Sequence, residues 1–584
     1  AAQPQLSVQR SIAGTMAMHG RTSWLLIALA TIAAAGAAGQ KQEMTSKVVD
    51  GSAAVVSRIA TSSAALAPSL RVNLTAICSS TPYPGACRTA LSSSASRSVK
   101  DPFAASVQFA MARAASARAL ARNLSASLSA RRGALPPSGM DDCAELLDIS
   151  HGQLGDALAA ATSHDATTWL SAALTNQGTC GDSLAAVEVT TGREGVRRRV
   201  SALAEFIGTA LALHAKLKAG SETIPAPPPS SASMPSSSPS NRTFPSWVSD
   251  HYRKLLESPV GMTPDAVVAL DGSGTHGTIG EAIAAVTASM PPVGGSSKAS
   301  VGAGRKVIYV KAGRYEESVR ISSKQRDVML MGDGKGKTVI VGHRSAADGY
   351  TTYASATVAA MGSGFIAKGL TIINNAGPGK GQAVALRVGG DLSVIYQCDI
   401  QAYQDTLYVH SNRQFYAEDS ISGTVDFIFG NSAVVIQNCD IHPRKPRLGQ
   451  EDTITAQGRT DPNQNTGISI HKCRITSTSD IGSTKVYLGR PWKRYSRTVV
   501  MESNLDRSIT PAGWMEWSGQ FALSTLYYGE YSNTGPGAGT SGRVKWSGVH
   551  TSLSAIDATR FTVQDFILGD SWLSDTGVSY ISGL

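Results

Sequence analysis

The sequence predicts a multi-domain protein in which an all-α four-helix bundle precedes an all-β parallel β-helix. Between about residues 70 and 218, apolar residues recur at three- and four-residue spacing, as they do in amphipathic helices packed into a bundle. After Val260 the chain changes to short β-branched runs separated by glycine, which is typical of strands and tight turns. A five-residue phrase also returns in this second part at a period of about 20 residues, which indicates a solenoid.

Residues 24–38, WLLIALATIAAAGAA, form an apolar run that follows Arg21 and precedes small residues. A run of this length is typical of a secretory signal and is short for a membrane span. We therefore expect residues 1–39 to be a leader with a signal peptide, cleaved near Ala38 or Gly39, and the protein to be exported. An uncleaved signal anchor is the alternative.

The domain boundaries follow from changes in composition. The bundle is expected over residues 70–218, which are rich in Ala, Leu and Ser. Residues 219–256 are rich in Pro and Ser and cannot bury a core, so they are predicted to form an extended linker. The β-helix is expected over residues 257–584. Sequons for N-glycosylation occur only in the bundle region and the linker, at Asn73, Asn123 and Asn241.

The solenoid repeat consists of the phrases YQCDI, AEDSI, QNCDI, HKCRI and MESNL, which close at Ile400, Ile421, Ile441, Ile475 and Leu505. The first two intervals are 21 and 20 residues, and the next two, 34 and 30, are expected to be the same coil with an inserted loop. Residues at equal phase should therefore stack on adjacent coils of a parallel β-helix.

Polar residues follow the same rhythm, at Gln382, Gln404, Asp405 and Asp426. Neighbouring strands lie roughly 4.8 Å apart, so two carboxamides and two carboxylates would gather in one patch on the outer wall. Polar groups in a β-rich wall are otherwise costly, which favours an active site. The alternative is a polar stack that only caps the turns of the solenoid.

Other catalytic motifs are absent from the sequence, which contains no G-x-S-x-G elbow, no H-E-x-x-H, no paired C-x-x-C and no P-loop. Asp405 and Asp426 on adjacent coils instead suit a mechanism in which one carboxylate attacks while the other stays protonated to donate. The attacking carboxylate needs a cation beside it. Arg490, in LGRPW, is the best candidate because its fork can hold a carboxylate at two points.

The formal net charge of +10 and the isoelectric point near 9.2 indicate a polyanionic partner. An exported chain without an RNA- or DNA-reading motif meets acidic polysaccharide first, so no nucleic-acid partner is expected. Basicity that serves only solubility is the alternative.

Seven cysteines in an exported chain should mostly be paired. Cys439 and Cys473 each stand two places before the closing Ile of a phrase, so they should stack within disulfide reach. Cys398 lies at the same phase but two coils from Cys439, with Asp419 between them. We therefore predict a Cys439–Cys473 bridge and a free Cys398.

Five motifs follow one another in the β-rich part, namely GRYEE (313–317), QAVALRV (382–388), QDTLY (404–408), DFIFG (426–430) and LGRPW (488–492). In this order and at this coil spacing they resemble the signature set of the pectin methylesterases, over essentially all of residues 257–584. The resemblance implies a right-handed parallel β-helix. It also implies hydrolysis of the C6 methyl esters of cell-wall homogalacturonan (pectin), with release of methanol and without a metal or organic cofactor.

The resemblance implies a role for each polar residue. Asp426 would be the nucleophile, and Asp405 would be the acid that protonates methanol and then the base that activates water. Gln382 and Gln404 would donate hydrogen bonds to the oxyanion, and Arg490 would hold Asp426.

Aromatic side chains should line the sugar groove. The candidates are Trp492, Trp514, Trp517, Tyr408 and Phe427, beside the polar Gln382. For Trp514 and Trp517 the alternative is ordinary packing under a loop.

The N-terminal part carries a second resemblance. ICSSTPYPGAC, DDCAELL and NQGTC are similar to the pectin methylesterase inhibitor-like bundle that precedes plant enzymes of this type. This resemblance implies the disulfides Cys78–Cys87 and Cys143–Cys180. A helical bundle with incidental cysteines is the alternative.

A basic pair ends the linker, in the run Arg253-Lys254-Leu255-Leu256. It resembles the family's processing motif, and a solvated charge pair is the alternative. The sequence thus predicts a secreted, monomeric proenzyme of the cell wall. Its expected partners are pectin, a processing protease and a separate proteinaceous pectin methylesterase inhibitor.

Two other functions are compatible with the same fold. The first is polyuronide cleavage by a lyase or polygalacturonase, although lyases of this shape need a Ca²⁺ cluster of several carboxylates. The second is a wall-binding or regulatory protein with an inactive β-helix, which the intact polar set from Gln382 to Arg490 disfavours.

Overall fold

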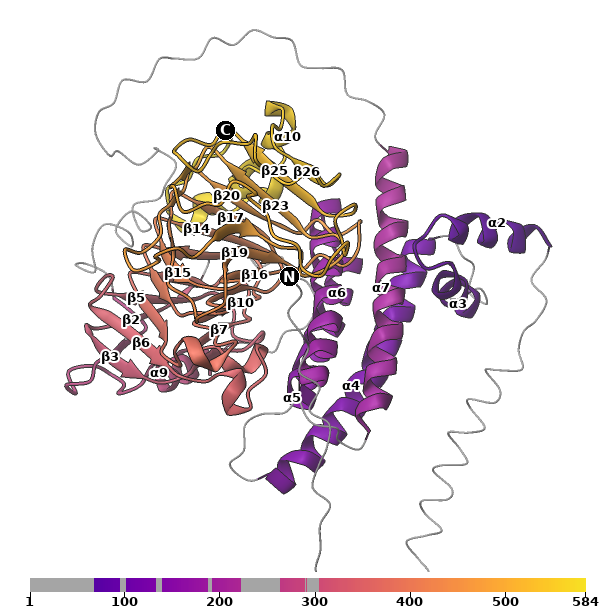
Figure 1. Cartoon of the computed structure of the whole chain (residues 1–584). Coiled ribbons are helices and arrows are strands. Elements are labelled where there is room, and N and C mark those ends of the chain that lie inside the picture. The colour runs from indigo at the N-terminus through magenta and orange to yellow at the C-terminus, as the bar shows by residue number, and fades with distance from the viewer. Residues whose placement is uncertain are drawn as a thin grey trace, which may run out of the picture. The chain divides into compact units, whose positions relative to one another are not determined.

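The structure is a computed structural model that describes residues 68–94, 101–132, 139–186, 192–221, 263–288, 290 and 304–584 (Figure 1). The expected signal peptide, the run from Arg253 to Leu256, the sequon at Asn241 and the side chain of Asn73 lie outside the described residues. Residues 74–584 belong to one compact unit.

The N-terminal part is helical, as predicted. Its helices are α2 (Pro68–Ser79), α3 (Pro84–Ser94), α4 (Pro102–Arg132), α5 (Gly139–Leu158), α6 (Ser163–Ala186) and α7 (Arg193–Ser221). Helices α4 to α7 pack against one another around a shared apolar core, which confirms the four-helix bundle. Helix α4 begins at Pro102, and the Asp101 carboxylate before it accepts a hydrogen bond from the Phe103 amide at 2.9 Å, so proline and an N-cap together define this start.

Both disulfides implied for the helical part are present. Cys78–Cys87 joins α2 to α3 with a Cα–Cα distance of 5.5 Å, and Cys143–Cys180 joins α5 to α6 at 4.6 Å. The stretch Arg193–Leu217 of α7 is long and apolar enough to cross a membrane, but half of its most apolar window is buried inside the protein. This burial is what the core helix of a bundle requires.

The C-terminal part is a parallel β-helix whose coils supply strands to three parallel sheets, called A, B and C here. Sheet A contains, in order, β1 (Ala266–Val268), β2 (Lys306–Val310), β5 (Val328–Gly332), β8 (Ile366–Lys368), β11 (Ser393–Tyr396), β14 (Arg413–Ala417), β17 (Ala433–Gln437), β20 (Gly467–His471), β23 (Arg497–Met501), β25 (Tyr527–Tyr531) and β26 (Val549–His550). Sheet B contains β3 (Gly313–Glu316), β6 (Thr338–Gly342), β9 (Thr371–Asn374), β12 (Asp399–Gln401), β15 (Ser420–Gly423), β18 (Asp440–Pro443), β21 (Arg474–Ile475) and β24 (Asn504–Leu505).

The polar residues predicted for the active site flank the strands of sheet C. Its strands are β4 (Val319–Ile321), β7 (Val358–Ala360), β10 (Leu386–Val388), β13 (Leu407–Val409), β16 (Ile428–Gly430), β19 (Asp452–Gln457) and β22 (Val486–Gly489). Among the residues that the structure describes, this part also contains several 3-10 turns and the short α-helices α9 (Ile279–Thr287), α10 (Ala555–Thr559) and α11 (Val563–Ile567).

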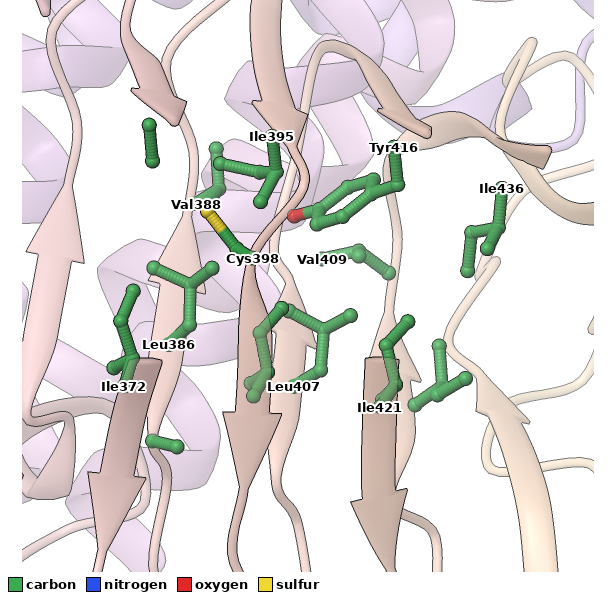
Figure 2. Close-up of a cluster of buried hydrophobic side chains, with 14 of the residues drawn as sticks. Ile372, Leu386, Val388, Ile395, Cys398, Leu407, Val409, Tyr416, Ile421 and Ile436 are labelled. Atoms are coloured by element: carbon green, nitrogen blue, oxygen red, sulfur yellow. The ribbon is translucent and has the colours of Figure 1, made fainter. Parts of the chain in front are cut away.

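The closing residues of the repeated phrases form a ladder inside the coil, which confirms the solenoid. They pair in register along sheet B and are fully buried, at Ile400, Ile421, Ile441, Ile475 and Leu505. Figure 2 shows this interior, where side chains of all three sheets belong to one buried cluster, among them Ile395 of sheet A, Ile421 of sheet B and Leu407 of sheet C. The apolar ladder fixes the register of the coils, because a slip of one residue would turn these side chains outward.

Each repeated phrase bends the chain between sheets A and B at its second residue. These residues have φ between 48° and 56°, at Gln397, Glu418, Asn438, Lys472 and Glu502. A left-handed backbone costs a non-glycine residue roughly 1–2 kcal/mol, so the packed ladder on either side must hold each bend in place.

The predicted Cys439–Cys473 disulfide is wrong, because both residues are free, buried thiols. A strand spacing of roughly 4.8 Å lies within the Cα–Cα range of disulfides, so equal phase permits a bridge but does not require one. The two Sγ atoms donate to backbone carbonyl oxygens instead, that of Cys439 to Gln437 and that of Cys473 to Ile436, each at 3.3 Å. Cys398 is free and buried, as predicted.

Candidate active site

The polar residues of the repeat lie just before strands of sheet C. Asp405 and Asp426 each stand two positions ahead of a strand, and the first residues of these strands, Leu407 and Ile428, pair in register. The two aspartates are therefore direct neighbours on adjacent coils, roughly one strand spacing of 4.8 Å apart along the stack. Gln382 precedes β10 on the coil before them.

The Asp426 carboxylate is held at three points. The Arg490 guanidinium donates from Nε to Oδ1 at 2.8 Å and from Nη2 to Oδ2 at 2.7 Å, in the two-point geometry predicted from the sequence. The Thr453 hydroxyl donates to Oδ1 at 2.6 Å and also accepts the Asp426 amide at 2.9 Å. Asp426 is 5% exposed, so these bonds replace the water that burial removes.

The Asp405 carboxyl group has a different environment. Burial raises its pKa well above the usual value, and the negative charge of Asp426 raises it further, while Arg490 acts in the opposite direction. The same pair of coils thus holds one carboxylate that is ion-paired and one carboxyl group that favours its protonated form.

A cavity of about 340 Å³ lies over these groups. The predicted residues that line it are Gln382, Gln404, Asp405, Tyr408, Asp426, Arg490, Trp492 and Trp517. The backbones of the two glutamines are tied to neighbouring coils, because Ala383 N donates to Gln404 O at 3.2 Å and Ala346 N donates to Gln382 O at 2.9 Å. The structure therefore brings all five predicted catalytic residues to one cavity.

Aromatic rings form part of the cavity wall. Tyr408 and Phe429 are stacked with ring centroids 4.2 Å apart, and Trp492 meets Phe429 edge-on at 5.9 Å. The Arg490 guanidinium lies 4.5 Å from the centroid of Trp517, which is 38% exposed. These rings provide apolar faces of the kind on which sugar rings stack.

Two of the predicted aromatic residues do not reach the cavity. Phe427 is fully buried in the core of the coil, and Phe429 lines the cavity in its place. Trp514 is 1% exposed, stacks on Tyr528 at 4.3 Å and donates from Nε1 to Glu530 at 3.3 Å, so it packs under its loop. Residues i and i+2 of a regular strand share a face, so the opposite directions of Phe427 and Phe429 arise because Phe427 lies in the turn after Asp426, where φ is 54°, and Phe429 lies in β16.

Thr453 was not predicted. It lies on β19 at the phase of Asp426, because Ile428 pairs with Thr455. The sequence interval of 27 residues conceals this match, since the connection between β18 and β19 makes this coil longer than the 20- or 21-residue period of the preceding coils. Once the inserted loop is allowed for, Thr453 occupies the same phase as Asp426.

Helix α6 of the bundle also lines the cavity, through Thr179, Asp182, Ser183 and Ala186. The Lys493 ammonium pairs with Asp182 at 2.9 Å. The Thr179 hydroxyl lies 3.3 Å from the Tyr408 hydroxyl and 3.0 Å from His410 Nε2. In the full-length chain the bundle therefore covers part of the cavity.

Comparisons with known proteins agree with the two-part organisation. Residues 265–570 match the Pectinesterase family model, and residues 73–213 match the model for plant invertase/pectin methylesterase inhibitors. The chain is 50% identical to the probable pectinesterase/pectinesterase inhibitor 16 of Arabidopsis thaliana over 84% of this chain and 90% of that protein. It is 46% identical to pectinesterase 2 of Citrus sinensis over 87% and 94%, respectively.

A solved structure of pectin methylesterase from carrot is similar to the β-helix, with a TM-score of 0.52 and 54% identity. The match covers 55% of this chain and 99% of the carrot chain, so the carrot protein corresponds in length to the β-helix alone. The chain described here belongs to the pectinesterase family and carries an N-terminal domain of the pectin methylesterase inhibitor type.

Proposed function

We propose that the chain hydrolyses the C6 methyl esters of homogalacturonan in pectin, releasing methanol and leaving free carboxylates, with Asp426 as the nucleophile. The observation that carries this proposal is the contrast between the two neighbouring aspartates. Asp426 is fixed by Arg490 and Thr453 as a carboxylate, while the environment of Asp405 favours a proton. A nucleophile beside an acid is what ester cleavage by a carboxylate requires.

In the first half of the reaction, an Asp426 carboxylate oxygen attacks the carbonyl carbon of the methyl ester. The negative charge that develops on the carbonyl oxygen accepts hydrogen bonds from the side-chain amides of Gln382 and Gln404, a stabilisation worth roughly 3 kcal/mol per donor. As the tetrahedral intermediate collapses, the bond to the methoxy oxygen breaks. Asp405 gives its proton to that oxygen, and methanol leaves. The galacturonate acyl group stays bound to Asp426.

In the second half, Asp405 is a carboxylate and acts as a base. It takes a proton from a water molecule, whose oxygen attacks the acyl carbon. The bond to Asp426 breaks, the galacturonic acid unit leaves and gives its remaining proton to solvent, and both aspartates return to their starting states. No metal and no organic cofactor enters either half.

We further propose that the chain is made as an exported proenzyme of the cell wall. Cleavage at Arg253-Lys254-Leu255-Leu256 would separate the bundle from the β-helix, and it would remove Asp182 and Thr179 from the cavity. The net charge of +10 suits an acidic polysaccharide as substrate. Pectin, a processing protease and a separate proteinaceous inhibitor are the proposed partners, and the processed enzyme is proposed to be a monomer.

Methanol release from pectin tests this function. Purified residues 263–584 and the full-length chain are compared on the same substrate, and the length of the polysaccharide is followed in parallel. We expect methanol without chain shortening, and a higher rate from the shorter protein. Chain shortening without methanol would instead indicate a lyase or polygalacturonase.

A further inference from the structure

One row of outward-facing side chains crosses sheet C in register. It consists of Arg320, Ala359, Arg387, Tyr408 and Phe429. Tyr408 and Phe429 belong to the catalytic cavity, so the row extends this surface toward β4. Neighbouring strands lie roughly 4.8 Å apart. Arg387 is therefore about one strand spacing from Tyr408, and Arg320 is about three spacings, or roughly 14 Å, from Tyr408. A polysaccharide bound along the row would therefore meet both arginines beyond the reacting sugar.

Carboxylates of the bundle lie against both arginines in the full-length chain. Glu145 of α5 forms an ion pair with Arg320. Asp142, one turn earlier, is buried near the positive charge of Arg387, and its carboxylate accepts a hydrogen bond from Thr351 at 2.5 Å. A small cavity of about 90 Å³ at this place is lined by both acids and both arginines.

The guanidinium of Arg387 retains unused binding capacity. Arg387 is 1% exposed, and its Cζ lies 3.3 Å from the ring centroid of Tyr353. Its Nη1 faces the sulfur of Met361 at 3.0 Å, while its Nε has no hydrogen-bond partner among the described residues. Buried N–H groups of arginine are normally satisfied, so a donor left open beside two carboxylates indicates a place where an anion binds.

We propose that Arg320 and Arg387 form a carboxylate subsite of the substrate groove. The subsite takes a galacturonate unit that has already lost its methyl ester, and Glu145 and Asp142 occupy it in the full-length chain. The inference rests on the proposed function, because it assigns a specificity to the same groove.

The chemistry distinguishes a free carboxylate from a methyl ester at this place. A guanidinium forms charge-assisted hydrogen bonds with a carboxylate, whereas the ester is neutral and offers weaker acceptors. Binding of one free unit at the subsite holds an ester a few sugars away over the catalytic pair. The enzyme would then act preferentially next to units that are already de-esterified, and free carboxylates would accumulate in blocks.

The test uses residues 263–584, since the carrot relative corresponds in length to this domain alone. Two substrates are compared, a fully methyl-esterified polygalacturonate and the same polymer with half of its esters removed at random. The measured quantity is the ratio of kcat/KM per ester on the second substrate to that on the first. The variant is Arg320→Gln, and the matched control is Arg474→Gln, which removes an exposed arginine from an ion pair with Asp440 on sheet B.

We expect the unmodified domain to favour the partly de-esterified polymer. Arg320→Gln should lower this preference about fivefold, through KM rather than kcat, which is the loss expected for a partly exposed charge pair. Arg474→Gln should leave the ratio unchanged. A ratio that does not move in Arg320→Gln, or that moves equally in both variants, would overturn the subsite.

Inhibition by methyl-free polygalacturonate provides a second measurement. The Arg320→Gln domain should require about five times more of this polymer for half inhibition, since the binding of a free carboxylate is what the substitution weakens. Equal inhibition of both domains would contradict the proposal. Methanol release from the fully esterified polymer by the unmodified domain tests the proposed function separately, so failure of the subsite and failure of the esterase reaction are distinguishable.

Discussion

Asp405 and Asp426 occupy the same turn position on adjacent coils, and both have a left-handed backbone, with φ of 65° and 54°. This conformation costs a non-glycine residue roughly 1–2 kcal/mol, and residues that pay such a cost cluster at functional sites. Here the repeated turn brings two carboxyl groups to one cavity, where Asp426 is ion-paired with Arg490 and burial raises the pKa of Asp405. The repeat of the coil places the two aspartates side by side. Arg490 and Thr453 donate hydrogen bonds to Asp426, which makes its environment different from that of Asp405.

Thr453→Val removes the hydroxyl that donates to Asp426 at 2.6 Å. We expect kcat for methanol release to fall about tenfold, the effect of losing one hydrogen bond to a charged group, with little change in KM. Thr559→Val is the control, because Thr559 is partly exposed on α10, away from the cavity, and its hydroxyl donates to the Ala555 carbonyl of the same helix. An equal loss in both variants would show that Thr453 does not position the nucleophile.

The raised pKa of Asp405 predicts the alkaline limb of the pH profile. The group must be protonated to release methanol, so kcat/KM falls as the pH rises through this pKa. Asp405→Asn cannot transfer a proton, so we expect its kcat/KM for methanol release to be about 10²- to 10⁴-fold lower. The pH profile of this variant should also lack the alkaline limb. A variant that keeps the same alkaline limb would assign the limb to another group.

Trp517 and Trp514 should respond differently to substitution. Trp517→Ala removes the ring beside Arg490 in the cavity, and we expect kcat/KM to fall about three- to tenfold with little change in thermal stability. Trp514→Leu leaves a void in the core and should cost about 2–4 kcal/mol of stability, with KM unchanged. Melting curves and kinetics of both variants check the assignment, which fails if Trp514→Leu raises KM without lowering Tm.

Asp419 lies between buried cysteines inside the coil, and burial raises its pKa to about 8. The folded state therefore binds a proton more tightly than the unfolded state, whose Asp titrates near 4. This proton contributes stability that is complete below about pH 4 and is lost as the pH rises toward 8.

Asp419→Asn keeps an oxygen for the Cys398 amide, which donates to Asp419 at 2.7 Å, and removes the titration. We expect the variant to be more stable at pH 8, on the order of 2 kcal/mol, and its stability to vary less between pH 4 and 8. Denaturant unfolding at several pH values checks this. Asp440→Asn on the exposed side of sheet B is the control and should show little change. An unaltered pH dependence in Asp419→Asn would contradict the titration of this group.

The sequence predicted the parts of the fold that repeat. The ladder from Ile400 to Leu505 has a fixed phase relative to its bends, so the coils and the positions of Asp405 and Asp426 followed from spacing. Arg490 lies in no repeated phrase and was chosen because its guanidinium can hold a carboxylate at two points, and the resemblance to the pectin methylesterases then implied the same role. Its two-point contact with Asp426 is present in the structure.

The sequence could not supply what depends on side-chain direction or on irregular connections. Phe427 and Phe429 are both candidates by composition, and strand alternation would give them the same direction. The turn at Asp426 leaves Phe427 in the core and Phe429 on the cavity wall. Thr453 was hidden by an inserted loop. The bridge between Cys439 and Cys473 was inferred from equal phase, but equal phase does not determine where each Sγ points, and both thiols donate to backbone carbonyl oxygens instead.

Replacement of Asp426 tests the central claim most directly. Asp426→Ala in residues 263–584 removes the attacking oxygen and leaves the aromatic wall of the cavity in place, so methanol release should fall by roughly 10³-fold or more while pectin binding changes little. Methanol release and pectin binding are measured on the same preparation, with circular dichroism to confirm folding. Methanol release at an undiminished rate from the folded variant would contradict the assignment of Asp426 as the nucleophile.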